Sequence, residues 1–191
     1  MRRGSIVYIL ATVILITTGY AESQAQAPGP GSSPCSPALV GVLVQSTVYS
    51  GGSASSLEPY DVKMTLLEVV RGEKAWDLLK EASVSNKPPK PGSEYILARI
   101  RFEYSASGVP GDKVWELGKE QFTALSPDGK LYETPSIVPP KPELSGSLRS
   151  GSSIEGWRVL QVSREDNKPL MSFDPASGGG MLRGKVLWFQ L

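Results

Sequence analysis

Residues 95–104, Tyr-Ile-Leu-Ala-Arg-Ile-Arg-Phe-Glu-Tyr, decide the fold class of this 191-residue chain. Every even position from 96 to 104 carries an apolar or aromatic side chain, whereas Arg99, Arg101 and Glu103 occupy odd positions. Successive side chains of a β-strand point to opposite faces, so this alternation is typical of a strand with one face buried and the other in solvent. The stretch therefore predicts a half-buried strand.

Strands of the same kind are predicted on both sides of this stretch. Residues 39–49 alternate, with four valines on one face, and residues 62–70 repeat the pattern. The further predicted strands are 121–125, 131–132, 154–162, 170–173 and 185–191. Together these runs predict about eight strands in the chain.

Turn signals separate the predicted strands. Residues 126–130, Ser-Pro-Asp-Gly-Lys, predict a hairpin turn because Pro127 fixes φ and Gly129 accepts a positive φ. The strands come as antiparallel-type runs divided by proline and glycine turns, without the strand–helix alternation of a parallel sheet. The predicted fold class is therefore all-β, an immunoglobulin-like antiparallel β-sandwich with one short helix near residues 73–82. The Cys-Trp-Cys pattern of antibody domains is absent.

The short helix is predicted from a change of period. Within residues 73–82, Trp76, Leu79 and two alanines fall on one helical face. The favoured interpretation is that Trp76 and Leu79 plug one open end of the sandwich. The alternative is that the helix is a partner-binding element.

The first 27 residues have the three parts of a signal peptide. A pair of arginines forms the basic start, residues 6–16 are almost wholly apolar, and Ala25-Gln26-Ala27 offers small residues for cleavage. The apolar run is weaker than the roughly 20 residues that a transmembrane helix needs, so residues 1–27 are predicted to be cleaved. The alternatives are cleavage after Ala21 and an uncleaved amino-terminal anchor.

Residues 28–38, Pro-Gly-Pro-Gly-Ser-Ser-Pro-Cys-Ser-Pro-Ala, are predicted to be a linker that does not pack, which leaves residues 39–191 as the domain. The linker holds Cys35, the only cysteine of the chain, so no intramolecular disulfide can form. Cys35 is predicted to be either a free thiol or half of an intermolecular disulfide. Residues 32–34 before it lack a lipoprotein pattern, so lipidation is not expected.

Composition argues against several classes of function. Without the signal peptide, the 20 basic and 19 acidic residues of the chain become eighteen of each, so the formal charge is zero. A neutral surface has no electrostatic footprint for nucleic acid or for an anionic membrane. The chain has no histidine, which removes Ser-His-Asp and Cys-His nucleophiles and histidine-bound zinc.

Motifs spread over residues 50–191 carry a family resemblance. They are 67–76 (Leu-Glu-Val-Val-Arg-Gly-Glu-Lys-Ala-Trp), 86–89, 92–98 (Gly-Ser-Glu-Tyr-Ile-Leu-Ala), Phe122 with 126–130, 150–157 (Ser-Gly-Ser-Ser-Ile-Glu-Gly-Trp), 168–170 and 188–191. These motifs resemble exported bacterial immunoglobulin-like domains of unknown function, some of which carry a label after a telomeric repeat-binding factor. The resemblance implies a sandwich and a cell-surface or secreted location, often through a lipoprotein cysteine pattern that this chain lacks. It implies no catalytic residue, and the label gives no ground for DNA binding.

Two groups of acidic residues are candidate sites. Glu116 and Glu120 are a candidate glycosidase-like pair, although any two surface acids would qualify equally. Residues 165–167, Glu-Asp-Asn, offer oxygen ligands for calcium together with Asp174. The favoured interpretation of the second group is a polar turn between strands.

Glycines and tryptophans give three weaker candidates. The glycines at 178–180 resemble a phosphate-binding loop only in composition, and a hairpin tip is the favoured interpretation. Trp115 and Trp188 are candidates for exposed binding residues, since exposed tryptophans often dominate interfaces. Burial of both in the core is the favoured alternative.

The sequence predicts an exported, non-catalytic interaction module of the cell envelope or extracellular space. Its partner is expected to be a protein or cell-envelope component, with no nucleic acid and no membrane contact except through an uncleaved signal segment. No catalytic, cofactor-binding or metal-binding residue and no cofactor is predicted. The alternatives are a carboxylate-dependent hydrolase of envelope polysaccharide and a carrier of a small ligand or calcium.

Overall fold

The computed structural model describes residues 29–50, 57–106, 114–178 and 182–191 of the chain. The predicted signal peptide, residues 1–27, lies outside these ranges. Within them, no helix has both the length and the apolar character that crossing a membrane requires.

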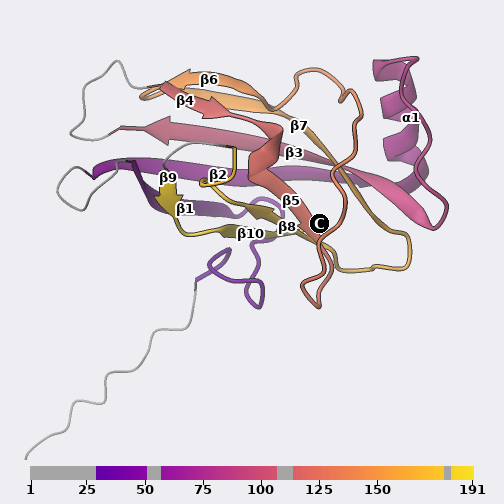
Figure 1. Ribbon diagram of the computed structural model, residues 1–191, viewed down its shortest axis with the longest axis horizontal. Coiled ribbons are helices and arrows are strands. Elements are labelled where there is room, and N and C mark those ends of the chain that lie inside the picture. The colour runs from indigo at the N-terminus through magenta and orange to yellow at the C-terminus, as the bar shows by residue number, and fades with distance from the viewer. Residues whose placement is uncertain (1–28, 51–56, 107–113, 179–181) are drawn as a thin grey trace, which may run out of the picture.

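A curved antiparallel sheet of five strands forms one layer of the molecule (Figure 1). Its strands are β1 (Leu43–Ser50), β2 (Glu58–Arg71), β3 (Ser93–Ser105), β7 (Ser153–Ser163) and β9 (Leu182–Gly184), in the spatial order β7-β3-β2-β1-β9. The long strand β3 pairs along most of its length with β2 on one side and with β7 on the other. The strand predicted at residues 95–104 is therefore confirmed as part of β3, near the middle of this sheet.

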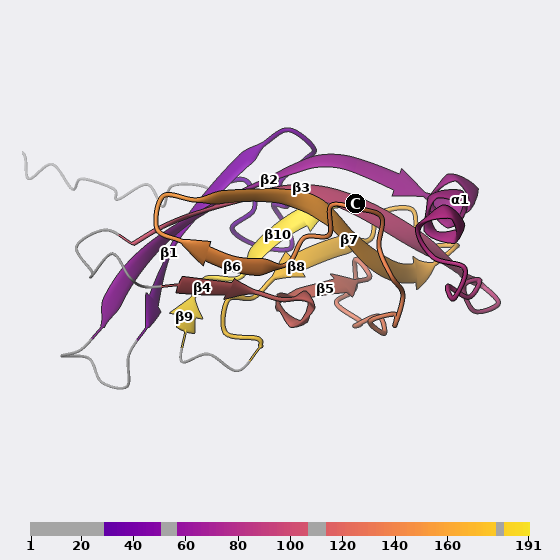
Figure 2. The same cartoon turned by 90° about the horizontal axis from the view of Figure 1, so that it is seen from above.

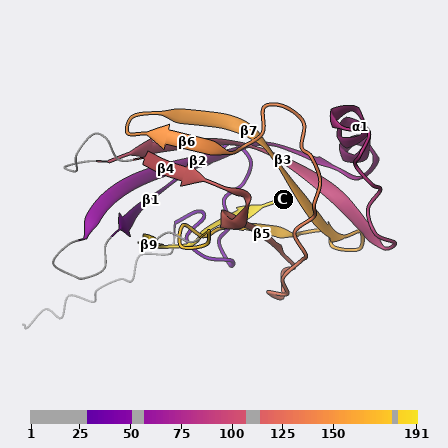
Figure 3. The same cartoon turned by 45° about the horizontal axis from the view of Figure 1, so that its top comes forward.

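Shorter strands cover one face of this sheet and form the second layer (Figures 2 and 3). Three of them pair in the order β10-β8-β5: β5 (Phe122–Leu125), β8 (Leu170–Phe173) and β10 (Leu187–Gln190). The other two, β4 (Val114–Leu117) and β6 (Gly146–Arg149), pair only with each other among the described residues. The predicted all-β, sandwich-like fold with one short helix is confirmed.

The main core lies between the two layers. Ile96, Ala98, Ile100 and Phe102 of β3 are fully buried, and Tyr104 is 2% exposed, because these even positions all face the second layer. Arg99 and Arg101 point to the other face, where both contact Glu155 of β7. The apolar positions of the alternating sequence are therefore those on the face of β3 that the second layer covers.

The helix α1 (Gly72–Ala82) packs on the outer face of the large sheet and does not plug an open end of the sandwich. Ala75 and Leu79 are fully buried against Leu97 and Val159, which are odd positions of β3 and β7. These odd positions face away from the main core, so the helix seals a second, smaller core. The predicted plug is wrong in this respect, because an apolar helical face does not indicate which side of a sheet it will cover.

Gly31 and Ala38 of the predicted linker bond to β10, so the expectation that this segment does not pack is wrong at these two positions. The division of the chain into a linker and a domain stays a prediction. Ala38 is fully buried, and its N–H donates to the Trp188 carbonyl at 2.8 Å. The Trp188 N–H donates to the Gly31 carbonyl at 2.9 Å. The prolines restrict the segment but leave enough main-chain donors and acceptors to pair with an open strand edge.

Candidate functional site

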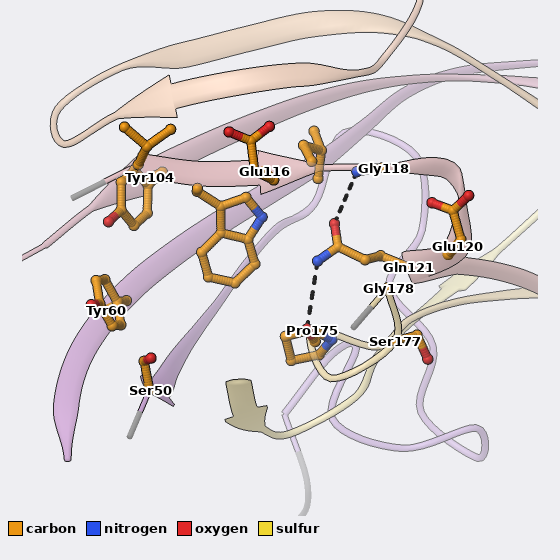
Figure 4. Close-up of a pocket in the computed structure, with 13 residues that line it drawn as sticks. Ser50, Tyr60, Tyr104, Glu116, Gly118, Glu120, Gln121, Pro175, Ser177 and Gly178 are labelled. Carbon is orange, nitrogen blue, oxygen red and sulfur yellow. Dashed lines mark hydrogen bonds between the residues drawn. The ribbon is translucent and has the colours of Figure 1, made fainter. Parts of the chain in front are cut away.

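A cleft of about 450 Å³ opens at one end of the sandwich (Figure 4). One side is β4 with the short helix η2 (Lys119–Gln121), and the other includes residues 175–178, which follow β8. The ends of β1, β2 and β3 contribute Ser50, Tyr60 and Tyr104. This site is referred to below as the β4 cleft.

Three aromatic side chains line the β4 cleft and continue into the core. The rings of Tyr60 and Tyr104 stack with centroids 5.8 Å apart, and those of Tyr104 and Trp115 lie 5.6 Å apart at a tilt. Trp115 also packs on Phe102 at 5.6 Å. Packing on all sides fixes the positions of these rings.

The structure shows how far each tryptophan that was a candidate for exposure is buried. Trp115 is 3% exposed and belongs to the main core, whereas Trp188 is half-buried on β10. The indole Nε1–H of Trp115 nevertheless has no hydrogen-bond acceptor among the described residues. A buried N–H without a partner is costly, and here it lies in the wall of a cleft.

Gln121 supplies a neutral amide at the inner end of the cleft (Figure 4). Its Oε1 accepts a hydrogen bond from the Gly118 N–H at 3.2 Å, and its Nε2 reaches the Pro175 carbonyl only at 3.5 Å. The main chain is tied more firmly, because the Asp174 N–H donates to the Gln121 carbonyl at 2.8 Å. Gln121 thus joins the two sides of the cleft and keeps an incompletely satisfied donor. Nothing in the sequence around this polar residue indicated such a role.

The candidate carboxylates Glu116 and Glu120 both border the cleft. Glu116 lies on the opposite face of β4 from Trp115, and both of its oxygens accept from the Ser147 hydroxyl at 2.7 Å. Both glutamates are solvent-exposed. Glycoside hydrolysis needs two carboxyl groups that flank one bond, with the acid usually kept protonated by an apolar environment.

The edge of β4 itself borders the cleft. All four residues of β4 and the following Gly118 line it. A strand that presented one face would contribute only alternate residues, and the Glu116 side chain is engaged with Ser147. This lining favours contact of the cleft with the edge of β4 that does not pair with β6.

The tyrosines of the cleft are held in their neutral form. The pKa of Tyr60 is raised far above its usual value of 10.0. Burial is the largest cause, and the next is the hydrogen bond that the Tyr60 hydroxyl donates to Glu58 at 2.6 Å. Burial, followed by the charge of Glu58, also raises the pKa of Tyr104. The folded cleft therefore resists ionisation of both phenols.

Alkaline pH is expected to destabilise the protein through these tyrosines. In the unfolded chain they ionise near pH 10, whereas in the folded protein they do so only at higher pH, so their contribution is present below about pH 10 and lost as the pH rises. Urea unfolding at about pH 8 and about pH 10.5 should show a clear fall in the midpoint. The variant Tyr60→Phe should show a smaller fall, and an equal fall in both proteins would contradict this assignment.

The calcium candidates are not brought together. Asp166 lies before β8, where its carboxylate accepts from the Tyr132 hydroxyl at 2.9 Å and from the Lys168 N–H at 3.0 Å. Asp174 lies after β8 and accepts from the Ala176 N–H and the Ser177 hydroxyl, both at 2.9 Å. Across the described ranges, no cluster of three or more acidic or cysteine side chains could hold a metal ion.

The remaining candidates are the glycines at 178–180 and Cys35. Gly178 lines the β4 cleft with a φ of +106°, and the two glycines after it lie outside the described ranges. Cys35 is exposed and carries a free thiol.

Comparison with known proteins gives one distant structural likeness. No protein-family model matches the chain, and no curated protein matches it. The chain is similar to the crystal structure of ycdA from Bacillus subtilis, which is provisionally described as a lipoprotein, with 13% sequence identity and a TM-score of 0.48. The match covers 68% of this chain and 36% of the ycdA chain. The resemblance to exported immunoglobulin-like domains therefore stays a prediction.

Proposed function

We propose that this protein is an exported, non-catalytic interaction module of the cell envelope or extracellular space, and that it holds its partner in the β4 cleft. The signal-peptide pattern of residues 1–27 supports export. The lack of histidine and the solvent exposure of Glu116 and Glu120 favour binding over catalysis. The partner is a protein or cell-envelope component, and the neutral charge balance argues against nucleic acid.

The observation that carries this proposal is the composition of the β4 cleft. Ligand sites are typically concave, mostly apolar, and supplied with a few polar groups that fix orientation. The cleft has the aromatic rings of Tyr60, Tyr104 and Trp115, together with the Gln121 amide. The Trp115 Nε1–H is a buried donor without an acceptor among the described residues, and we expect the partner to supply one.

A photo-crosslinking residue placed at Val114 tests this proposal. Val114 is 47% exposed and borders the cleft, so the probe would reach a bound partner without disturbing the core. The expected result is an adduct with one component of the parent cell envelope, saturable and displaced by excess unmodified protein.

The control carries the same probe at Val84, which is fully exposed beyond α1 and does not line the cleft. The same adducts from both positions, or adducts from Val84 alone, would contradict binding in the cleft. A specific adduct from Val114 alone would support it.

A carboxylate-dependent hydrolase of envelope polysaccharide is the second candidate function. Its support is that Glu116 and Glu120 border the same cleft. This function requires the release of reducing ends from cell-wall glycans and its loss in Glu120→Gln. The bond between Glu116 and Ser147 and the exposure of both glutamates make it the weaker candidate.

A further inference from the structure

We propose that the β4 cleft binds an extended peptide segment of a partner protein, which pairs through its main chain with the open edge of β4. This inference rests on the proposed function and specifies the chemistry of its partner. It is carried by three features of the cleft: an unpaired strand edge, a gap in the second layer, and unsatisfied neutral donors.

The first feature is the edge of β4. In the described residues β4 pairs only with β6, and no main-chain bond outside that pair engages residues 114–117. An open antiparallel edge presents N–H and C=O groups from alternate residues, which is the template for strand addition. Because consecutive residues of β4 line the cleft, this edge is where a ligand would lie.

The second feature is the gap that faces this edge. In the second layer β5 pairs with β8, and beyond this pair the Asp174 N–H donates to the Gln121 carbonyl and the Gln121 Nε2 reaches the Pro175 carbonyl at 3.5 Å. Beyond these bonds η2 leads back to β4 on one side, and residues 175–178 form the other side, where a Cβ on Gly178 would lie 3.7 Å from the Cγ of Gln121. The cleft lies between these two sides (Figure 4), and the proposed peptide strand would occupy it.

The third feature is the chemistry of the walls. The buried Trp115 Nε1–H lacks an acceptor within the described part of the chain, and the Gln121 Nε2 has only a long bond to the Pro175 carbonyl. Both are neutral donors that suit the carbonyl oxygens of a peptide. The described residues that line the cleft include Glu116 and Glu120 but no lysine or arginine. We therefore expect apolar or small side chains toward the aromatic wall and a lysine or arginine toward Glu120.

Selection from a displayed library of random octapeptides on the immobilised exported protein tests this inference. Enriched peptides are then synthesised with single N-methyl groups at each position, and their affinities are measured by calorimetry. N-methylation removes one main-chain donor and blocks strand pairing at that residue. Methylation at one set of alternate residues should weaken binding about tenfold at each position. Methylation at the other set should leave binding within about twofold.

Two variants separate the cleft from the rest of the surface. Trp115→Phe removes the indole N–H while keeping an aromatic ring, and it should weaken the selected peptides about fivefold. Trp188→Phe is the matched control on β10 and should leave the affinity unchanged. Equal effects from both variants would overturn the inference.

The remaining outcomes are also decisive. Losses that do not alternate along the peptide, or no enriched peptide, would overturn strand addition. Binding of an N-acetylglucosamine oligosaccharide that Trp115→Phe weakens, without any peptide binding, would overturn it in favour of a glycan. In each of these cases a specific adduct from Val114 would still support the interaction module, so the two proposals fail separately.

Discussion

Replacing Gly156 with alanine is expected to lower the free energy of unfolding by about 3 kcal/mol. A Cβ at this buried position of β7 would lie 2.6 Å from the carbonyl carbon of Glu143 and 2.6 Å from the Leu144 nitrogen. Both are main-chain atoms, so no side-chain rotation can relieve the contact. The segment that leads into β6 must move away from β7.

That displacement breaks several interactions at once. The Leu144 N–H donates to the Trp157 carbonyl at 3.0 Å, and the Trp157 N–H donates to the Pro142 carbonyl at 2.8 Å. Leu144 is fully buried, and the guanidinium of buried Arg158 donates to its carbonyl oxygen. Loss of the two main-chain bonds and partial exposure of Leu144 account for the expected magnitude.

Urea denaturation of Gly156→Ala beside Gly29→Ala measures this effect. A Cβ on Gly29 meets nothing within 4 Å, so the control should change stability by less than about 0.5 kcal/mol. Wild-type stability in Gly156→Ala would mean that residues 142–144 do not rest on β7 in solution.

Replacing Trp115 with alanine is expected to cost about 4 kcal/mol. The indole is 3% exposed and contacts Phe102, Tyr104 and Phe173, with ring centroids 5.6, 5.6 and 6.4 Å away. Its removal leaves a cavity between the β4–β6 pair and the large sheet, which the surrounding rings fill only in part.

The control for this substitution is Trp76→Ala. Trp76 is half-buried on α1, where it contacts Tyr95 at 6.1 Å and Lys80 at 5.8 Å, so its loss should cost only about 1–2 kcal/mol. Thermal unfolding of the two variants compares them directly. A Trp115→Ala protein with an unchanged melting temperature would place the indole on the surface, as a direct partner contact.

The long elements were predictable because their signals are local. Each of these signals indicates which side of one element is buried: the alternation does so in β1, β2, β3 and β7, and the apolar face does so in α1. The turn after β5 was also predicted, and it is closed by the Gly129 N–H bonded to the Ser126 carbonyl at 2.9 Å. The strand predicted at residues 131–132 is only an isolated bridge between Leu131 and Leu125. In each case the pattern lies within about a dozen neighbouring residues.

The short elements around the cleft were not predictable in the same way. The strand β6 reads Gly-Ser-Leu-Arg and carries almost no periodic signal. It forms because it follows the 142–144 segment on β7 and reaches β4 in antiparallel register. Gln121 lies in a run predicted as plain strand, and only the fold brings its amide across to Pro175.

Local patterns in the amino-acid sequence were enough to predict the period-two strands, the amphipathic helix and a signal peptide, and the sequence contains no histidine. Only the packing of the described residues shows that α1 covers the outer face, that Gly31 and Ala38 bond to β10, and that the second edge of β4 has no main-chain partner among them. Periodicity shows that one face of an element is buried, because buried positions carry apolar side chains. It does not show what buries that face, since pairing joins segments far apart in the chain and depends on the packing of the whole fold.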